Sequence, residues 1–182
     1  MLAYLFILFA VAVRMPFMPH PWNFTPVAAA LLYFGARGSR RQLWIPLALL
    51  AASDVILTKF VYAYQFTWDH YFTWLWYAAI LWLGTNLSEN TSLRGVKDWL
   101  RIGGAAVAGS VSFFIVSNFA VWACWPTYPK SLAGLTTCYA AGIPFFRHTL
   151  AGDMLFAAAM FGLPALAAAL AHSGETHRAT AA

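Results

Sequence analysis

Long apolar stretches alternate with short polar or proline-rich segments along almost the whole chain. A helix needs about 20 mostly apolar residues to cross a bilayer, and about 17 are enough. The pattern therefore predicts an all-α, polytopic membrane protein with six helices in one compact bundle, over residues 1–18, 27–36, 44–61, 71–87, 103–123 and 149–171. We expect residues 1–171 to form a single transmembrane domain and residues 172–182 a short cytoplasmic tail.

Three of the connecting segments are unusually rich in proline or aromatic residues. Arg14–Pro26 contains four prolines, and we expect a folded-in loop there because proline lacks an amide donor and restricts the residue before it. Tyr62–His70 is a second, aromatic loop. The longest break, Cys124–Asp153, mixes prolines, glycines, both cysteines and charged residues, so we expect residues 124–148 to form a partly buried cap over the helices.

The distribution of basic residues predicts how the six helices are oriented, because cytoplasmic loops carry an excess of Lys and Arg. With the N-terminus inside, the inner segments are 37–41, 88–101 and the tail. They contain seven of the eleven basic residues, namely Arg37, Arg40, Arg41, Arg94, Lys97, Arg101 and Arg178. We therefore expect both termini inside (N-in, C-in) in a bacterial inner membrane, with the three unusual connections outside. No basic residue precedes the first apolar stretch, so we expect a retained helix and not a cleaved signal peptide.

The composition supports a membrane location and excludes one class of partner. Only 9% of the residues are charged, against about 25% in a typical soluble domain. The net charge of +5 is scattered and forms no basic stripe, so we predict no nucleic-acid binding. The two cysteines, Cys124 and Cys138, are too few for a disulfide framework, and both a single disulfide and two free thiols stay open.

Asp54 is the most informative polar residue, because it lies about ten residues into the third apolar stretch and therefore near mid-bilayer. An uncompensated charge there costs at least about 2.5 kcal/mol on insertion scales. We expect Asp54 to be neutral, paired with a cation or exposed to a wet cavity. Its candidate partners are Arg14, Lys59 and Arg147. Two interpretations stay open: a buried ion pair that fixes helix packing, and the floor of a binding pocket.

We expect a ligand to bind between the outer connections and the outer ends of the helices. The candidate substrate-binding residues are Arg14, His20, Trp22, Asn23, Asp54, Asn118, Trp125, Tyr128, Arg147 and Asp153. His20, His70 and His148 all fall in outer connections. No two of these histidines have the spacing of a local ligand pair, so we predict no metal site.

The sequence contains no Gly-x-Ser-x-Gly, P-loop, His-Glu-x-x-His or glycine-rich dinucleotide motif. We therefore expect neither an enzyme nor a bound cofactor, and transport would need another source of energy. A membrane enzyme that uses Asp54, His148 and Asp153 is the least supported alternative.

Four segments carry a resemblance: PHPWNFTPVAAALLYFGA at 19–36, the Ser53-Asp54 pair, SNFAVW at 117–122 and YPKSLAGLTTCYAAGIPFFRHTLAGD at 128–153. They resemble an uncharacterised family of small bacterial membrane proteins that is labelled as transport proteins. That family is in turn similar to the substrate-binding S components of energy-coupling-factor (ECF) vitamin transporters. The resemblance implies a six-helix bundle that binds a water-soluble vitamin or a metal ion from outside and delivers it to a transmembrane coupling subunit driven by two ATPases.

The leading hypothesis is a non-enzymatic protein that captures a small vitamin-like molecule, such as the corrinoid cobalamin, at its outer face. The expected partners are the lipid bilayer, this molecule and the coupling subunit. The first helix lacks the Ala-x-x-x-Ala spacing that S components use for docking, so a transporter that works alone is also open. The alternative from another class is an accessory transmembrane subunit of a larger respiratory or photosynthetic complex.

Overall fold

A computed structural model describes residues 1–16, 21, 23–87 and 95–180, and this part of the chain contains six α-helices and no strand. The helices are α1 (Leu2–Val13), α2 (Val27–Arg37), α3 (Trp44–Ile56), α4 (Asp69–Asn86), α5 (Val96–Cys124) and α6 (Leu132–Thr180). A 3₁₀ turn over Arg40–Gln42 precedes α3, and a π-helical turn over Leu57–Val61 extends it. The all-α prediction is confirmed.

Three segments in the described part of the chain are long and apolar enough to cross a membrane: Arg40–Val61, Val96–Cys124 and Leu132–Ala171. Helices α1 and α2 are apolar but have only 12 and 11 residues, which is too short to cross a bilayer. The prediction of membrane helices is therefore confirmed for three segments, and six complete spans stay a prediction.

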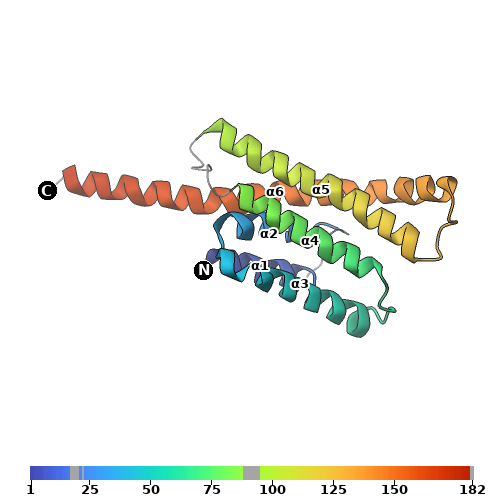
Figure 1. The fold of residues 1–182 in the computed structure, drawn as a ribbon. Helices are drawn as coiled ribbons and strands as arrows, with labels where there is room; N and C mark the ends of the chain where they lie inside the picture. Colours follow the sequence, from blue (N-terminus) through green and yellow to red (C-terminus); the bar gives the residue numbers. More distant parts are fainter. Residues whose placement is uncertain (17–20, 22, 88–94, 181–182) are drawn as a thin grey trace.

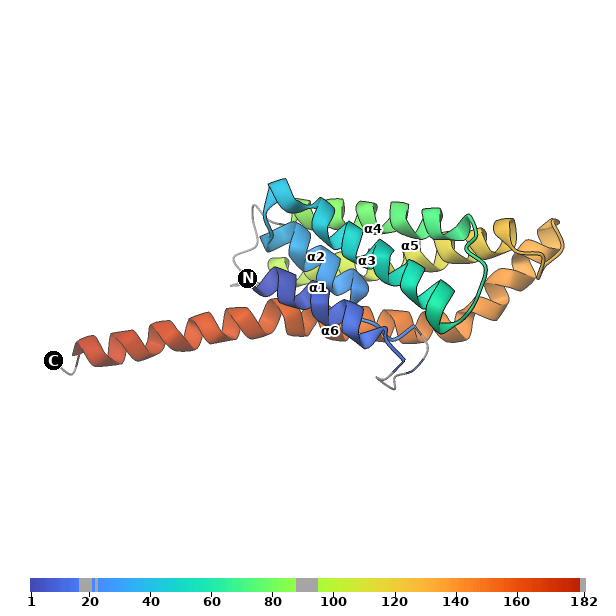
Figure 2. The same ribbon diagram turned by 90° about the horizontal axis from the view of Figure 1, so that it is seen from below.

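The short helix α2 forms the centre of the bundle, because every residue from Val27 to Ala36 is buried. Its sequence is apolar on all sides, as expected for a helix with no solvent-facing stripe. It packs against α1, α4, α5 and α6 (Figures 1 and 2). Helices α5 and α6 pair with each other, and in Figure 1 α5 lies on the opposite side of the bundle from α1 and α3.

Helices α2 and α4 approach each other closely through two glycines. A Cβ atom on Gly35 would lie 2.2 Å from the carbonyl oxygen of Leu81, and one on Gly84 would lie 2.5 Å from the carbonyl oxygen of Leu32. Small residues allow helix backbones to come together where no side chain fits between them. The two glycines therefore set the distance between the central helix and α4.

The helices alternate in direction. At one end of the bundle α3 is followed by α4, and α5 is followed by α6 (Figure 1). The opposite end holds the starts of α1 and α3 and the end of α2. The chain leaves α1 and enters α2 only partway along α3 (Figure 2). The α3–α4 and α5–α6 connections lie at the same end of the bundle, whereas the described part of the α1–α2 connection lies partway along it, and the predicted topology stays a prediction.

The expected cap over residues 124–148 is wrong, because α6 already begins at Leu132 and only residues 125–131 connect it to α5. Helix α6 continues through Pro144. Its glycines are packing positions and not breaks: a Cβ atom on Gly142 would lie 2.4 Å from Oδ1 of Asn118 in α5. Proline and glycine are tolerated inside membrane helices when neighbouring helices satisfy and cover the backbone.

Three further boundaries differ from the sequence pattern. Helix α1 ends at Val13 and not at residue 18, and α5 begins at Val96 within the segment expected to be a hydrophilic loop. Helix α6 continues to Thr180 through most of the expected tail, and its last part projects beyond the other helices (Figure 1). The apolar stretches indicated where the helices lie. They did not indicate the turns of more polar residues by which α5 and α6 extend beyond those stretches.

We expect Gly84→Ala and Gly35→Ala each to destabilise the protein by about 1–3 kcal/mol, the usual cost of forcing extra atoms into a packed core. Gly104→Ala in α5 is the matched control, because a Cβ atom there has no neighbour within 4 Å. It should be neutral or slightly stabilising, since alanine favours a helix over glycine. Thermal unfolding in mild detergent measures all three, and equal melting temperatures would contradict the close crossing.

Candidate functional site

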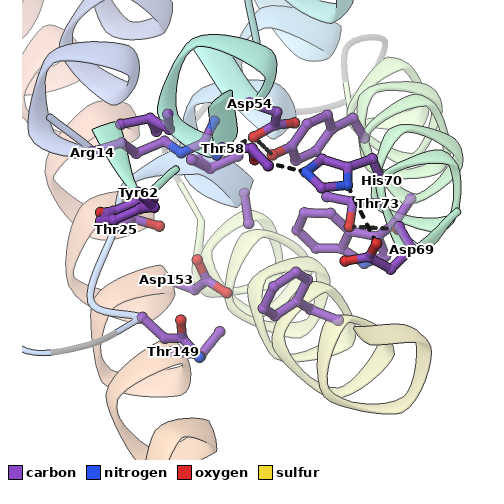
Figure 3. Close-up of a pocket in the computed structure, with 17 residues that line it drawn as sticks. Arg14, Thr25, Asp54, Thr58, Tyr62, Asp69, His70, Thr73, Thr149 and Asp153 are labelled. Atoms are coloured by element: carbon purple, nitrogen blue, oxygen red, sulfur yellow. Dashed lines mark hydrogen bonds and ion pairs between the residues drawn. The ribbon is translucent and has the colours of Figure 1, made fainter. Parts of the chain in front are cut away.

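A cavity of about 280 Å³ lies between the helices at the level where α1 ends and α2 begins (Figure 3). All six helices or the segments next to them contribute to its lining. The polar lining residues are Arg14, Asn23, Thr25, Asp54, Thr58, Asp69, His70, Thr73, Thr149 and Asp153. Ligand pockets typically measure about 300–1,000 Å³, so this cavity suits a small molecule.

One side of the cavity is an ion pair between Arg14, directly after α1, and Asp54 in α3. The guanidinium also donates to Oγ of Ser53 at 2.8 Å. The carboxylate accepts further hydrogen bonds from Nε1 of Trp74 at 2.9 Å and from the hydroxyl of Tyr77 at 3.3 Å. Of the three candidate partners for Asp54, Arg14 is therefore the one that binds it. Each charge of the pair is already compensated by the other.

The backbone that follows Asp54 leaves regular α-helical geometry. The π-helical turn Leu57–Val61 comes directly after α3, and Ala63 has a φ of 53°, which is uncommon for a residue other than glycine. Such turns within helices occur frequently at functional sites. Here the turn brings Thr58 and Tyr62 into the cavity lining (Figure 3).

A hydrogen-bonded group at the start of α4 forms the rim next to this turn. Nε2 of His70 lies 2.8 Å from Oγ1 of Thr58, and Nδ1 lies 3.2 Å from the carbonyl oxygen of Thr67 and 3.3 Å from Oδ1 of Asp69. The ring of Phe66 stacks on the imidazole with centroids 4.3 Å apart. The histidine thus ties α4 to the end of α3. In the described part of the chain no three metal-ligating side chains gather in one place.

Asp153 in α6 lies across the cavity from the Arg14–Asp54 pair (Figure 3). It is only 3% exposed, and Oδ2 accepts a hydrogen bond from Oγ of Ser110 in α5 at 2.6 Å. Among the described residues no cation pairs with it. The second buried carboxyl group therefore differs from Asp54, because no cation of the described residues pairs with it.

A second cavity of about 330 Å³ lies between α5 and α6. It shares Asn23, Phe113 and Thr149 with the first cavity, so these three side chains separate the two spaces. The remaining lining residues are mostly aromatic or small, and none is charged. Cys138 belongs to this wall, where its thiol donates to the carbonyl oxygen of Asn118 at 3.3 Å. Both cysteines are free thiols.

The structure divides the expected site residues into groups. Arg14, Asn23, Asp54 and Asp153 line the first cavity, whereas Asn118 and Tyr128 line the second, again with Asn23. Trp125 and Arg147 line neither, and His20 and Trp22 lie outside the described residues. Arg147 lies on α6 six positions before Asp153, so the two side chains are on different faces of the helix. Asp153 is on the buried face, and Arg147 is exposed.

Sequence reasoning missed the contribution of α4 and of the threonines. Asp69, Thr73 and Tyr77 follow each other at four-residue spacing in α4, and Thr149 and Asp153 have the same spacing in α6. Residues four apart share a helix face, so these two polar stripes could have been found. The many aromatic residues around the first stripe and the expected cap around the second obscured them.

The chain belongs to a family of unknown function (DUF6580), whose model matches residues 1–175. No curated protein and no solved structure matches it.

We expect Asp54→Leu and Arg14→Met each to destabilise the fold by about 3–5 kcal/mol, because either leaves one buried charge without its partner. The double variant should lose less stability than either single variant, since no uncompensated charge remains. Lys59→Met, at an exposed position on the π-helical turn, is the control and should be nearly neutral. Unfolding in detergent measures the cycle. If the free energy of unfolding of the double variant falls by the sum of the two single losses, the two side chains are not coupled.

Proposed function

We propose that this chain is a multi-pass protein of the bacterial inner membrane that captures a small water-soluble molecule from outside for uptake. The observation that carries the proposal is the first cavity, which places a buried ion pair and a further buried carboxylate between membrane-suited helices. Ionisable groups inside membrane proteins are costly and mark ligand or ion pathways. The sequence contains none of the common catalytic motifs, which favours binding over catalysis.

The proposal includes six membrane helices with both termini inside. Arg40 and Arg41 precede α3, and Arg101 lies near the start of α5, at the end of the bundle opposite the α3–α4 and α5–α6 connections. Such an excess of basic residues is typical of the cytoplasmic end of a membrane bundle. This orientation places the α3–α4 and α5–α6 connections outside.

The connection between α1 and α2 supports a water-filled cavity. Arg14 bonds to Ser53 and Asp54, which lie more than halfway along α3, so non-helical backbone occurs at membrane depth. Irregular backbone is tolerated there only where protein buries it or where it lines a water-filled space. A cavity that opens outward gives this connection water and gives a solute a route in.

The size of the cavities supports a small ligand. The first cavity measures about 280 Å³ and the second about 330 Å³, near the lower end of the usual range for ligand pockets, which favours a small molecule within the proposed vitamin-like class. Release to the inside needs a conformational change and a source of energy. A separate coupling subunit with ATPases, of the kind that serves ECF transporters, is one source, and transport by this chain alone is the other.

Screening a panel of vitamins and other small water-soluble metabolites against the purified chain tests the proposal. At about 100 times its dissociation constant, the correct ligand should stabilise the folded state by roughly 2.7 kcal/mol and raise the melting temperature. Arg147→Gln, outside both cavities, should keep this shift. The absence of any shift, together with purification as a stoichiometric part of a large complex, would favour an accessory subunit instead.

Cysteine labelling tests the orientation. In a chain with Cys124→Ser and Cys138→Ser, single cysteines at the exposed positions Gln65 and Thr127 should react with an impermeant maleimide in intact cells. A cysteine at Ser39, at the opposite end, should react only after the cells are opened. The reverse pattern would place the cavity-bearing end inside and contradict uptake from outside.

A further inference from the structure

We infer that the ligand is a small organic cation, an amine that carries a flat apolar group, with its charge against Asp153 and its apolar part in the second cavity. This inference rests on the proposed function and narrows it to a substrate class. Four features carry it: the charges of the first cavity, the surroundings of Asp153, the aromatic wall and the neutral second cavity.

The charges that line the first cavity are unequal. Asp54, Asp69 and Asp153 contribute carboxylates, whereas Arg14 contributes the guanidinium. Arg14 is bound by Asp54 and Ser53, so an anionic ligand would have to break this ion pair to obtain a partner. The side chains of Arg147 and Lys130 line neither cavity. Electrostatics therefore favours a positively charged ligand over a negatively charged one.

Asp153 provides the specific contact. Its only hydrogen-bond donor among the described side chains is the hydroxyl of Ser110, and its carboxyl group reaches the cavity surface. An ionised carboxylate with so little compensation is costly away from water. A ligand ammonium group next to it would remove that cost and would form a charge-assisted hydrogen bond, which is stronger than a neutral one.

Aromatic side chains complete the site for the cation. Trp76, Tyr77 and Phe113 line the same cavity as Asp153. The polar atoms of the first two are already used, because Trp76 donates to Oγ of Ser112 at 2.9 Å and Tyr77 donates to Asp54. These rings pack against one another, with centroids 5.8 Å apart for Trp76–Tyr77 and 4.9 Å apart for Trp76–Phe113. Where they line the cavity they offer apolar surface, and a cation near an aromatic ring face is attracted to it.

The second cavity is suited to the uncharged part of the same ligand. Phe114, Phe145 and Phe146 contribute to its lining, and the amide of Asn118 provides a polar group. Among the described residues, Asn23, Phe113 and Thr149 line both cavities, so the two spaces are neighbours. A molecule with an ammonium group and an aromatic ring joined by a short linker could therefore occupy both spaces.

The test uses three probes with one skeleton and different charges: 2-phenylethylamine, 2-phenylethanol and phenylacetate, together with ethylamine as the cation without a ring. Binding to the full chain in detergent is measured from thermal stabilisation over a millimolar concentration range. We expect the aryl amine to bind at least about tenfold more tightly than the alcohol or the acid, which corresponds to about 1.4 kcal/mol. Asp153→Asn should abolish this advantage, whereas Asp153→Glu should retain part of it.

Ala141→Phe, which fills the second cavity, should remove the preference for the aryl amine over ethylamine and leave the charge preference unchanged. Equal or tighter binding of the alcohol or the acid would overturn the cationic class but leave the proposed function intact. A charge preference that survives Asp153→Asn would overturn the role of this residue. If no probe binds and no member of the metabolite panel binds either, both the inference and the proposed function fail.

Discussion

The ion pair between Arg14 and Asp54 determines where the first two helices meet the rest of the bundle. Arg14 directly follows α1, and its bonds to Ser53 and Asp54 hold the start of the α1–α2 connection against the last turn of α3. Helix α2 then begins partway along the bundle and runs buried through its centre. Without this contact the position of the two short helices along the bundle would depend on helix packing alone. The cavity would also lose the side that Arg14 and Asp54 form.

The pair also explains why the two aspartates of the cavity differ in function. Asp54 accepts from three donors that belong to two elements: Arg14 at the end of α1, and Trp74 and Tyr77 in α4. Its charge is used for packing, which was one of the two interpretations of the sequence. Asp153 faces the same space with a single serine partner. Under our proposal, Asp54 holds the helices together and Asp153 contacts the ligand.

Much of the fold was predictable, because apolar length and basic residues report directly on the membrane environment. Residues 44–61 and 71–87 were located to within two residues, and Asp54 was identified as a buried charge in need of a partner. The start of α6 was not predictable from the same rules. Pro144 and Gly142 would be expected to interrupt a helix in water, but here α6 continues through both, and Gly142 packs against Asn118 of α5. The site residues of α4 were missed because their spacing of four lies among many aromatic residues, although the sequence alone contains it.

Asn23 connects these observations in another way. It belongs to the short link between α1 and α2, has a φ of 61° and borders both cavities. Asparagine accepts this left-handed conformation more readily than most residues. A change in this one link would alter the boundary between the two cavities while every helix kept its place. Under the proposed function, members of the family would differ in the ligand they accept through changes in a few residues of this link, with the helix bundle unchanged.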